Sequence, residues 1–179
     1  MLIRILIGGL LACWASLCVA APVQDISQYK LSSGDIININ VFSEPDLTFK
    51  ELLLTDAGTF SYPFIGEVKA RGRTTAEIEQ LLIRSLKGDY LVDPKVSVSV
   101  LQYRSFYISG EVKLPGGYAY QPGLTMRRAV ALAGGLTERA SEKRITIIRD
   151  LDENRTPARA GMDTPVMPGD TVTIDQGLF

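Results

Sequence analysis

The sequence contains no histidine and very little cysteine, and both absences restrict the chemistry open to the protein. Without an imidazole the chain cannot build a Ser-His-Asp or Cys-His catalytic group, or a zinc site with histidine ligands. Its two cysteines, Cys13 and Cys18, both lie within the first 20 residues. If those residues are removed, the remaining chain has no thiol and no disulfide, which suits an oxidising compartment.

Patterns that bind phosphate groups or nucleic acids are also missing. The pairs Gly116-Gly117 and Gly134-Gly135 lack the Lys-Ser/Thr tail of a P-loop and the G-x-G-x-x-G spacing. The net charge is −1 and no basic cluster occurs, so we expect no nucleic-acid partner. We also expect no cofactor and no bound metal.

Two carboxylates acting together could in principle hydrolyse a glycosidic bond. The acids that recur in similar contexts are Glu67 with Glu111, and Asp35 with Asp170. Each lies beside the glycine of an expected turn, which favours a capping or solvated role over catalysis. We therefore predict that the protein is not an enzyme.

The first 20 residues have the features of a signal peptide. Arg4 is the only early charge, residues 5–19 are mostly apolar, and Ala20 is a small residue suited to cleavage. The apolar stretch is shorter than the ~20 residues that span a bilayer, although a retained membrane anchor is an alternative. Lipidation at Cys13, which ends a Leu-Leu-Ala-Cys sequence, is a second alternative to cleavage after Ala20.

The central stretch of the chain predicts a strand, a turn and a helix. The strand includes Phe106 and Ile108 and ends at Gly110, and Pro115-Gly116-Gly117 predicts the turn. Thr125 stands where it would cap the helix. The stripe Met126, Ala129, Val130 and Ala133 has helical spacing, and Gly134-Gly135 ends it.

Similar patterns occur twice, which predicts two related small modules. Ile65-Gly66-Glu67-Val68 parallels Ser109-Gly110-Glu111-Val112, and Ser33-Gly34-Asp35 parallels Pro168-Gly169-Asp170. In the earlier half, a capping box from Thr74 to Glu77 begins a helix with its apolar stripe at Ile78, Leu81, Leu82 and Leu86.

Short strands with alternating polarity account for most of the remaining chain. We expect them at residues 36–42, 59–62, 64–68 (following Pro63), 95–100, 143–149 and 171–174. One face of the strand at residues 95–100 carries serines, so that face meets either bulk water or an enclosed channel.

Tyrosines are the residues best suited to contact a sugar, because an aromatic ring offers an apolar face with a polar tip. Tyr103, Tyr107, Tyr118 and Tyr120 cluster in sequence around the central stretch. We consider them possible glycan contacts, with ordinary strand or core positions as the alternative.

The ordered motifs resemble those of the outer-membrane polysaccharide export proteins over nearly all of the chain after the leader. The first half is similar to their export-sequence domain, and the second to their soluble-ligand-binding β-grasp (SLBB) domain. The residues at motif and turn positions are Gly34, Asp35, Pro45, Gly58, Pro63, Gly66, Pro94, Gly110, Pro115, Gly116, Gly134, Gly135, Gly169 and Asp170.

The resemblance implies an α+β fold with one short helix packed on the sheet of each domain. It places the export domain at residues 27–104 and the β-grasp-like domain at residues 105–176. The implied protein is periplasmic, associates with the outer membrane, and forms a closed ring of about eight subunits. That ring would pass a capsule or exopolysaccharide chain outward, together with an inner-membrane chain-length regulator.

Larger members of the family carry a further ligand-binding module and a C-terminal amphipathic helix that lines an outer-membrane pore. Residues 175–179 are shorter than the ~20 residues of a spanning helix or the ~9–11 of a barrel strand. We therefore expect a separate outer-membrane pore protein as a partner. The alternatives to an export ring are a glycan-binding or scaffold module that forms no ring and, less favoured, a polysaccharide hydrolase.

Overall fold

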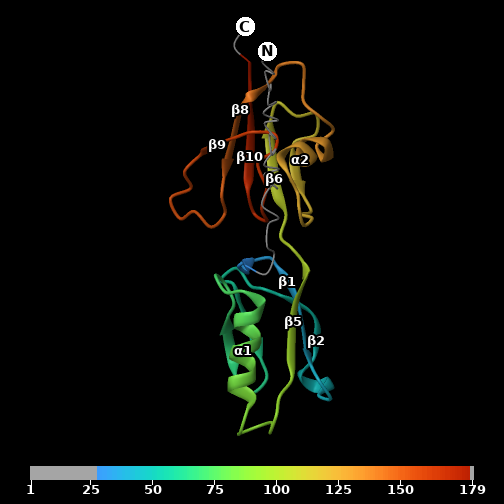
Figure 1. Ribbon diagram of the computed structural model, residues 1–179, viewed down its shortest axis with the longest axis vertical. Helices are drawn as coiled ribbons and strands as arrows, with labels where there is room; N and C mark the ends of the chain where they lie inside the picture. Colours follow the sequence, from blue (N-terminus) through green and yellow to red (C-terminus); the bar gives the residue numbers. More distant parts are fainter. Residues whose placement is uncertain (1–27, 178–179) are drawn as a thin grey trace, which may run out of the picture.

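The computed structural model describes residues 28–177 and shows two modules stacked along the long axis of the molecule (Figure 1). The predicted signal peptide and Cys13 lie outside the described residues. Each module has its own core of buried apolar side chains. We call elements β1 to β5 the first module and elements β6 to β10 the second module. The expected α+β architecture, with two short helices and small sheets, is confirmed.

The first module consists of a three-stranded sheet, a hairpin and a helix. The sheet has the order β2-β1-β5, with β1 (Ile36–Val41) antiparallel to both β2 (Phe49–Leu53) and β5 (Val96–Gln102). The hairpin joins β3 (Thr59–Tyr62) to β4 (Gly66–Lys69), and a short 3-10 helix, η2 (Pro45–Leu47), follows β1.

Helix α1 (Thr75–Leu86) packs along β5 and confirms the predicted capping box. The Thr74 hydroxyl accepts a hydrogen bond from the Glu77 N–H at 3.2 Å, and the Glu77 carboxylate accepts one from the Thr74 N–H at 2.7 Å. Both bonds use donors that the first turn of a helix leaves unpaired. The predicted apolar stripe is buried at Ile78, Leu82 and Leu86.

The second module is a five-stranded sheet, ordered β7-β6-β10-β8-β9, with helix α2 beside it (Figure 1). The central strand β10 (Thr171–Gln176) runs parallel to β6 (Phe106–Gly110) and antiparallel to β8 (Ala140–Ile148). The edges are the short strands β7 (Gly116–Tyr118) and β9 (Ala158–Ala160).

Helix α2 (Met126–Leu132) buries Met126, Ala129 and Val130, as the sequence predicts. Thr125 occupies the expected capping position, but its side chain makes no capping hydrogen bond. Backbone carbonyls take over this role, because Met126 and Arg127 donate their N–H groups to the carbonyls of Thr164 and Met162, both at 2.9 Å. The segment before β10 therefore fixes where α2 begins.

Three local predictions were wrong or incomplete. The strand expected at residues 64–68 begins only at Gly66, because Phe64 and Gly66 adopt positive φ angles of 65° and 83° and close the β3–β4 turn. Gly116 and Gly117 do not form the predicted turn but lie in β7, where the missing side chain of Gly117 leaves room for the Tyr107 ring. Strands β2 and β9 were not foreseen.

Gly110 ends β6 where the backbone of the neighbouring strand comes closest. Its φ of 84° lies in the left-handed region, and a Cβ there would overlap the carbonyl oxygen of Ile174 in β10. A residue without a side chain is needed both for this conformation and for this approach.

Within residues 28–177, no helix is long and apolar enough to cross a membrane. The same residues contain no cluster of three or more acids that could hold a metal ion.

We expect Leu82→Ala to lower the free energy of unfolding by about 2–5 kcal/mol, because it opens a cavity at a fully buried position in the first core. Leu132→Ala, on the outer face of α2 where the side chain is 45% exposed, is the matched control and should change it by less than about 1 kcal/mol. Urea unfolding of the chain without residues 1–20 measures both. Equal losses would contradict the core assignment.

We expect Gly110→Val to destabilise the second module by at least about 2 kcal/mol, since it combines a left-handed φ with a clash against β10. Lys113→Ala, three residues further on and exposed, should have little effect. Thermal unfolding of both variants provides the comparison, and a wild-type midpoint for the valine variant would show that β10 can move away.

Candidate functional site

Two turns of the same design begin the central strands of the two modules. In the first, Gly34 has a φ of 83°, and the Asp35 carboxylate accepts a hydrogen bond from the Ser32 N–H at 2.9 Å. In the second, Gly169 has a φ of 82°, and the Asp170 carboxylate accepts one from the Met167 N–H at 2.6 Å. Each aspartate therefore caps its own turn.

Each aspartate also pairs with an arginine that follows the neighbouring antiparallel strand. Arg104 follows β5, and its Nη1 lies 3.2 Å from Asp35 Oδ2. Arg149 follows β8, and its Nη1 lies 2.6 Å from Asp170 Oδ2. Asp35 and Asp170 are buried, so the solvated role considered for them is wrong, and the arginines supply the compensating charge.

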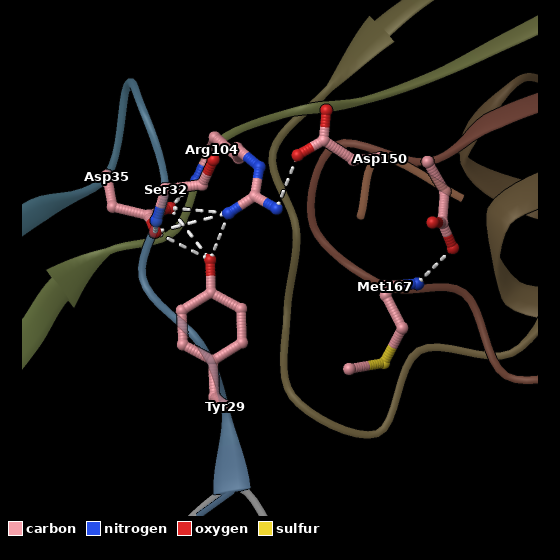
Figure 2. Close-up of polar contacts among 7 residues, drawn as sticks. Tyr29, Ser32, Asp35, Arg104, Asp150 and Met167 are labelled. Carbon is pink, nitrogen blue, oxygen red and sulfur yellow. Dashed lines mark hydrogen bonds and ion pairs between the residues drawn. The ribbon is translucent and has the colours of Figure 1, made fainter. Parts of the chain in front are cut away.

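Arg104 joins the two modules, because its guanidinium contacts acids on both sides (Figure 2). Its Nη2 donates to Asp150 Oδ2 at 2.8 Å, while its backbone N–H donates to Asp35 Oδ1 at 3.0 Å. The Tyr29 hydroxyl completes the cluster by donating to Asp35 at 2.7 Å and accepting from Arg104 Nη1 at 2.5 Å. We call Tyr29, Asp35, Arg104 and Asp150 the junction cluster.

The glycines of the two turns lie on either side of Arg104. A Cβ on Gly34 would stand 3.7 Å from Arg104 Cβ, which is an ordinary contact. A Cβ on Gly169 would stand 2.5 Å from Arg104 Nε and 2.8 Å from the Asp150 side chain. Gly169 therefore provides both the positive φ of its turn and the space in which Arg104 meets Asp150.

Burial changes the ionisation of several groups at the junction. It raises the pKa of the Tyr29 hydroxyl, and the adjacent Asp35 carboxylate raises it further. Burial also raises the pKa values of Tyr103 and Tyr120. For Asp170, burial raises the pKa despite hydrogen bonds from Met167 and Arg149 that lower it. Because the pKa of Asp170 is higher in the folded protein than in the unfolded chain, the folded state loses stability as the pH rises through that folded pKa.

A cavity of about 510 Å³ lies beside the junction cluster. Its walls include the rings of Tyr29, Tyr103 and Tyr120, which meet edge to face. Ring centroids are 4.9 Å apart for Tyr29 and Tyr103 and 5.3 Å apart for Tyr103 and Tyr120. Leu151 and Met167 line the side that belongs to the second module. Apolar surface therefore dominates a site with charged groups at its margin.

The four tyrosines considered as glycan contacts do not share one site. Tyr103 and Tyr120 lie in the cavity. Tyr107 is 55% exposed in β6, where its ring lies against Gly117. Tyr118, in β7, donates its hydroxyl to the Leu114 carbonyl at 2.5 Å.

The paired carboxylates considered for hydrolysis are engaged in structural contacts. Glu67 in β4 accepts a hydrogen bond from Thr59, and Glu111, in the second module, accepts one from Thr137. Both Asp35 and Asp170 are bound to backbone N–H groups and to arginines. All four carboxylates are therefore occupied by hydrogen bonds or ion pairs.

Sequence reasoning missed Tyr29, Arg149, Asp150 and the role of Arg104, which it considered only as a boundary between modules. The repeated Gly-Asp pairs were the available signal. A buried aspartate before a strand requires a cation nearby, and an arginine stands one or two residues after each antiparallel partner strand.

We expect Arg104→Ala to lower the free energy of unfolding by about 3–5 kcal/mol, because it leaves Asp35 buried without a counter-charge. Asp150→Asn removes the partly exposed partner and should cost about 0–1 kcal/mol. Urea unfolding at neutral pH checks both values. A loss for Arg104→Ala as small as that for Asp150→Asn would mean that water reaches Asp35.

Comparison with known protein families matches each module separately. The family model described as "Polysaccharide biosynthesis/export protein" matches residues 23–101. The model of the SLBB domain matches residues 105–166. The two matches occur in the expected order and together account for most of the chain.

Curated relatives have related descriptions. The chain is 46% identical over 82 residues to the exopolysaccharide production protein ExoF of Rhizobium meliloti, a match that covers 45% of this chain and 20% of that protein. It is 29% identical over 133 residues to the EPS I polysaccharide export outer membrane protein EpsA of Ralstonia solanacearum, with 60% and 35% covered. The EpsA protein of Ralstonia nicotianae is 27% identical over 181 residues, with 83% and 47% covered.

The chain thus spans less than half the length of each of these relatives. Two family models in series, matched by two modules with separate cores, nevertheless give a consistent assignment. The chain thus combines a region of the polysaccharide biosynthesis/export family, at residues 23–101, with an SLBB domain, at residues 105–166.

Proposed function

We propose that the protein is a non-enzymatic component of an exopolysaccharide export machine in the periplasm, associated with the outer membrane. The observation that carries this proposal is the ordered match to an export model and an SLBB model. The names of ExoF and EpsA, which refer to exopolysaccharide production and to polysaccharide export, support it. The engaged carboxylates at the junction are in keeping with a role in binding and assembly.

We also propose that copies of the chain assemble into a ring that surrounds the polymer, of about eight subunits by family resemblance. Within residues 28–177 the sheets end at β2 and β5 in the first module and at β7 and β9 in the second. The β5 edge is partly occupied, because the Val98 N–H donates to the Glu79 carboxylate at 2.7 Å. Unpaired strand edges are ready to associate with another chain. The elongated two-module body (Figure 1) would give such a ring depth along its axis.

The partners in this proposal follow from the family resemblance. They are the polysaccharide itself, an inner-membrane chain-length regulator, and a separate outer-membrane pore protein. The second candidate function is a periplasmic glycan-binding or scaffold module that forms no ring, and the aromatic cavity at the junction favours it.

Deletion of the gene tests the export role. We expect the deletion strain to lose most of its secreted exopolysaccharide, and a plasmid copy of the wild-type gene to restore it. Carbohydrate in the medium and in the periplasm is measured in parallel, since an export defect moves polymer from the first fraction to the second. Unchanged secretion would contradict the export role.

Sedimentation velocity of the chain without residues 1–20 separates the two candidates. A ring gives one species several times the mass of the monomer, because closed symmetry limits growth. A glycan-binding module that forms no ring sediments as a monomer across the same concentrations. If the chain sediments as a monomer but the deletion strain loses export, the export role stands. A ring made of this chain alone is then rejected.

A further inference from the structure

We propose that the cavity at the junction binds a short, neutral stretch of saccharide, one or two sugar rings long, through the rings of Tyr103 and Tyr120. This inference rests on the proposed export function and adds to it the place and the chemistry of polymer contact. It excludes Tyr107 and Tyr118, which lie outside the cavity.

The size and the walls of the cavity suit a sugar. Its volume of about 510 Å³ falls in the range of small-molecule sites, which runs from about 300 to 1,000 Å³. A pyranose has an apolar C–H face and a rim of hydroxyls, so it matches aromatic walls with polar groups at the edge. Edge-to-face packing at interplanar angles of 80° and 74° holds the three tyrosine rings in fixed orientations.

The charges around the cavity favour a neutral ligand. Arg104 is paired with Asp35 and Asp150, and Arg149 is paired with Asp170. Among the described residues that line the cavity, the exposed Lys30 is the one cation outside these ion pairs. An anionic sugar would have to compete with carboxylates that already bind their arginines.

Arg104, one of the residues that line the cavity, keeps one donor unpaired within the described part of the chain. The Arg104 side chain is only 10% exposed, and within residues 28–177 its Nε donor has no hydrogen-bond partner. A buried donor without an acceptor is unfavourable by about 1–3 kcal/mol.

Both modules contribute to the cavity. Tyr29 packs against the first core, whereas Tyr103 and Tyr120 belong to the second. A bound sugar would therefore contact both modules, next to the cluster that already joins them.

NMR of the tyrosine rings tests this inference. The chain has seven tyrosines, so labelling with ¹³C at the ring positions gives a small set of signals that single Tyr→Phe variants assign. The probe is a mixture of oligosaccharides of two to four units, released by partial acid hydrolysis from the exopolysaccharide that the host strain secretes. We expect the signals of Tyr29, Tyr103 and Tyr120 to shift, and those of Tyr62, Tyr90, Tyr107 and Tyr118 to remain.

Two variants separate binding from folding. Tyr103→Leu should weaken binding of the same oligosaccharides about tenfold, whereas the matched Tyr107→Leu should leave it unchanged. Leu151→Arg places a large charged group on a cavity wall where the side chain is 54% exposed, so it should block binding without disturbing either core. Wild-type affinity in both cavity variants would overturn the inference.

The outcome can be told apart from failure of the export role. If the deletion strain loses export but no cavity tyrosine shifts at millimolar oligosaccharide, the export role stands and the saccharide site is rejected. Shifts confined to Tyr107 and Tyr118 would also reject it, by placing polymer contact on the β6–β7 edge. If the deletion strain exports normally but the cavity signals shift, the protein is a glycan-binding module outside the export route.

Discussion

The pairing of Arg104 with the buried Asp35 is the interaction on which the arrangement of the two modules depends. A carboxylate removed from water requires a counter-charge and hydrogen bonds, and Asp35 has both: the guanidinium and backbone N–H of Arg104, the Ser32 N–H and the Tyr29 hydroxyl. Because the same guanidinium reaches Asp150 in the second module, the need to compensate one buried charge also ties the two modules together.

The second module uses the same device for its own central strand. Asp170 caps a turn with a positive-φ glycine and meets Arg149, as Asp35 caps its turn and meets Arg104. In both modules the aspartate precedes the central strand, and the arginine follows the strand that runs antiparallel beside it. The ion pair therefore joins two neighbouring strands at one end of a sheet. The two turns meet at Arg104, since Gly34 and Gly169 lie against it.

This construction suits the role proposed for the chain. A subunit of an export ring has to keep its parts in register while a long polymer moves past, and a junction held by ion pairs and fixed aromatic rings resists bending. It also leaves a cavity beside the joint, walled by tyrosines from both sides. The proposed saccharide contact and the mechanical connection would then occupy the same place in the molecule.

Local patterns in the sequence determined most of the secondary structure. The capping box at Thr74, the stripe through Ile78 and Leu82, and the positions of the expected strands depend on neighbours a few residues apart, so they can be read from the chain. Predictions failed where distant backbone decides the conformation. Gly116 became part of an edge strand because β6 lies beside it, and α2 took its capping acceptors from Met162 and Thr164. The candidate site was beyond sequence reasoning for the same reason: Tyr29, Arg104 and Asp150 are far apart in the chain, and only the folding of both modules brings them together.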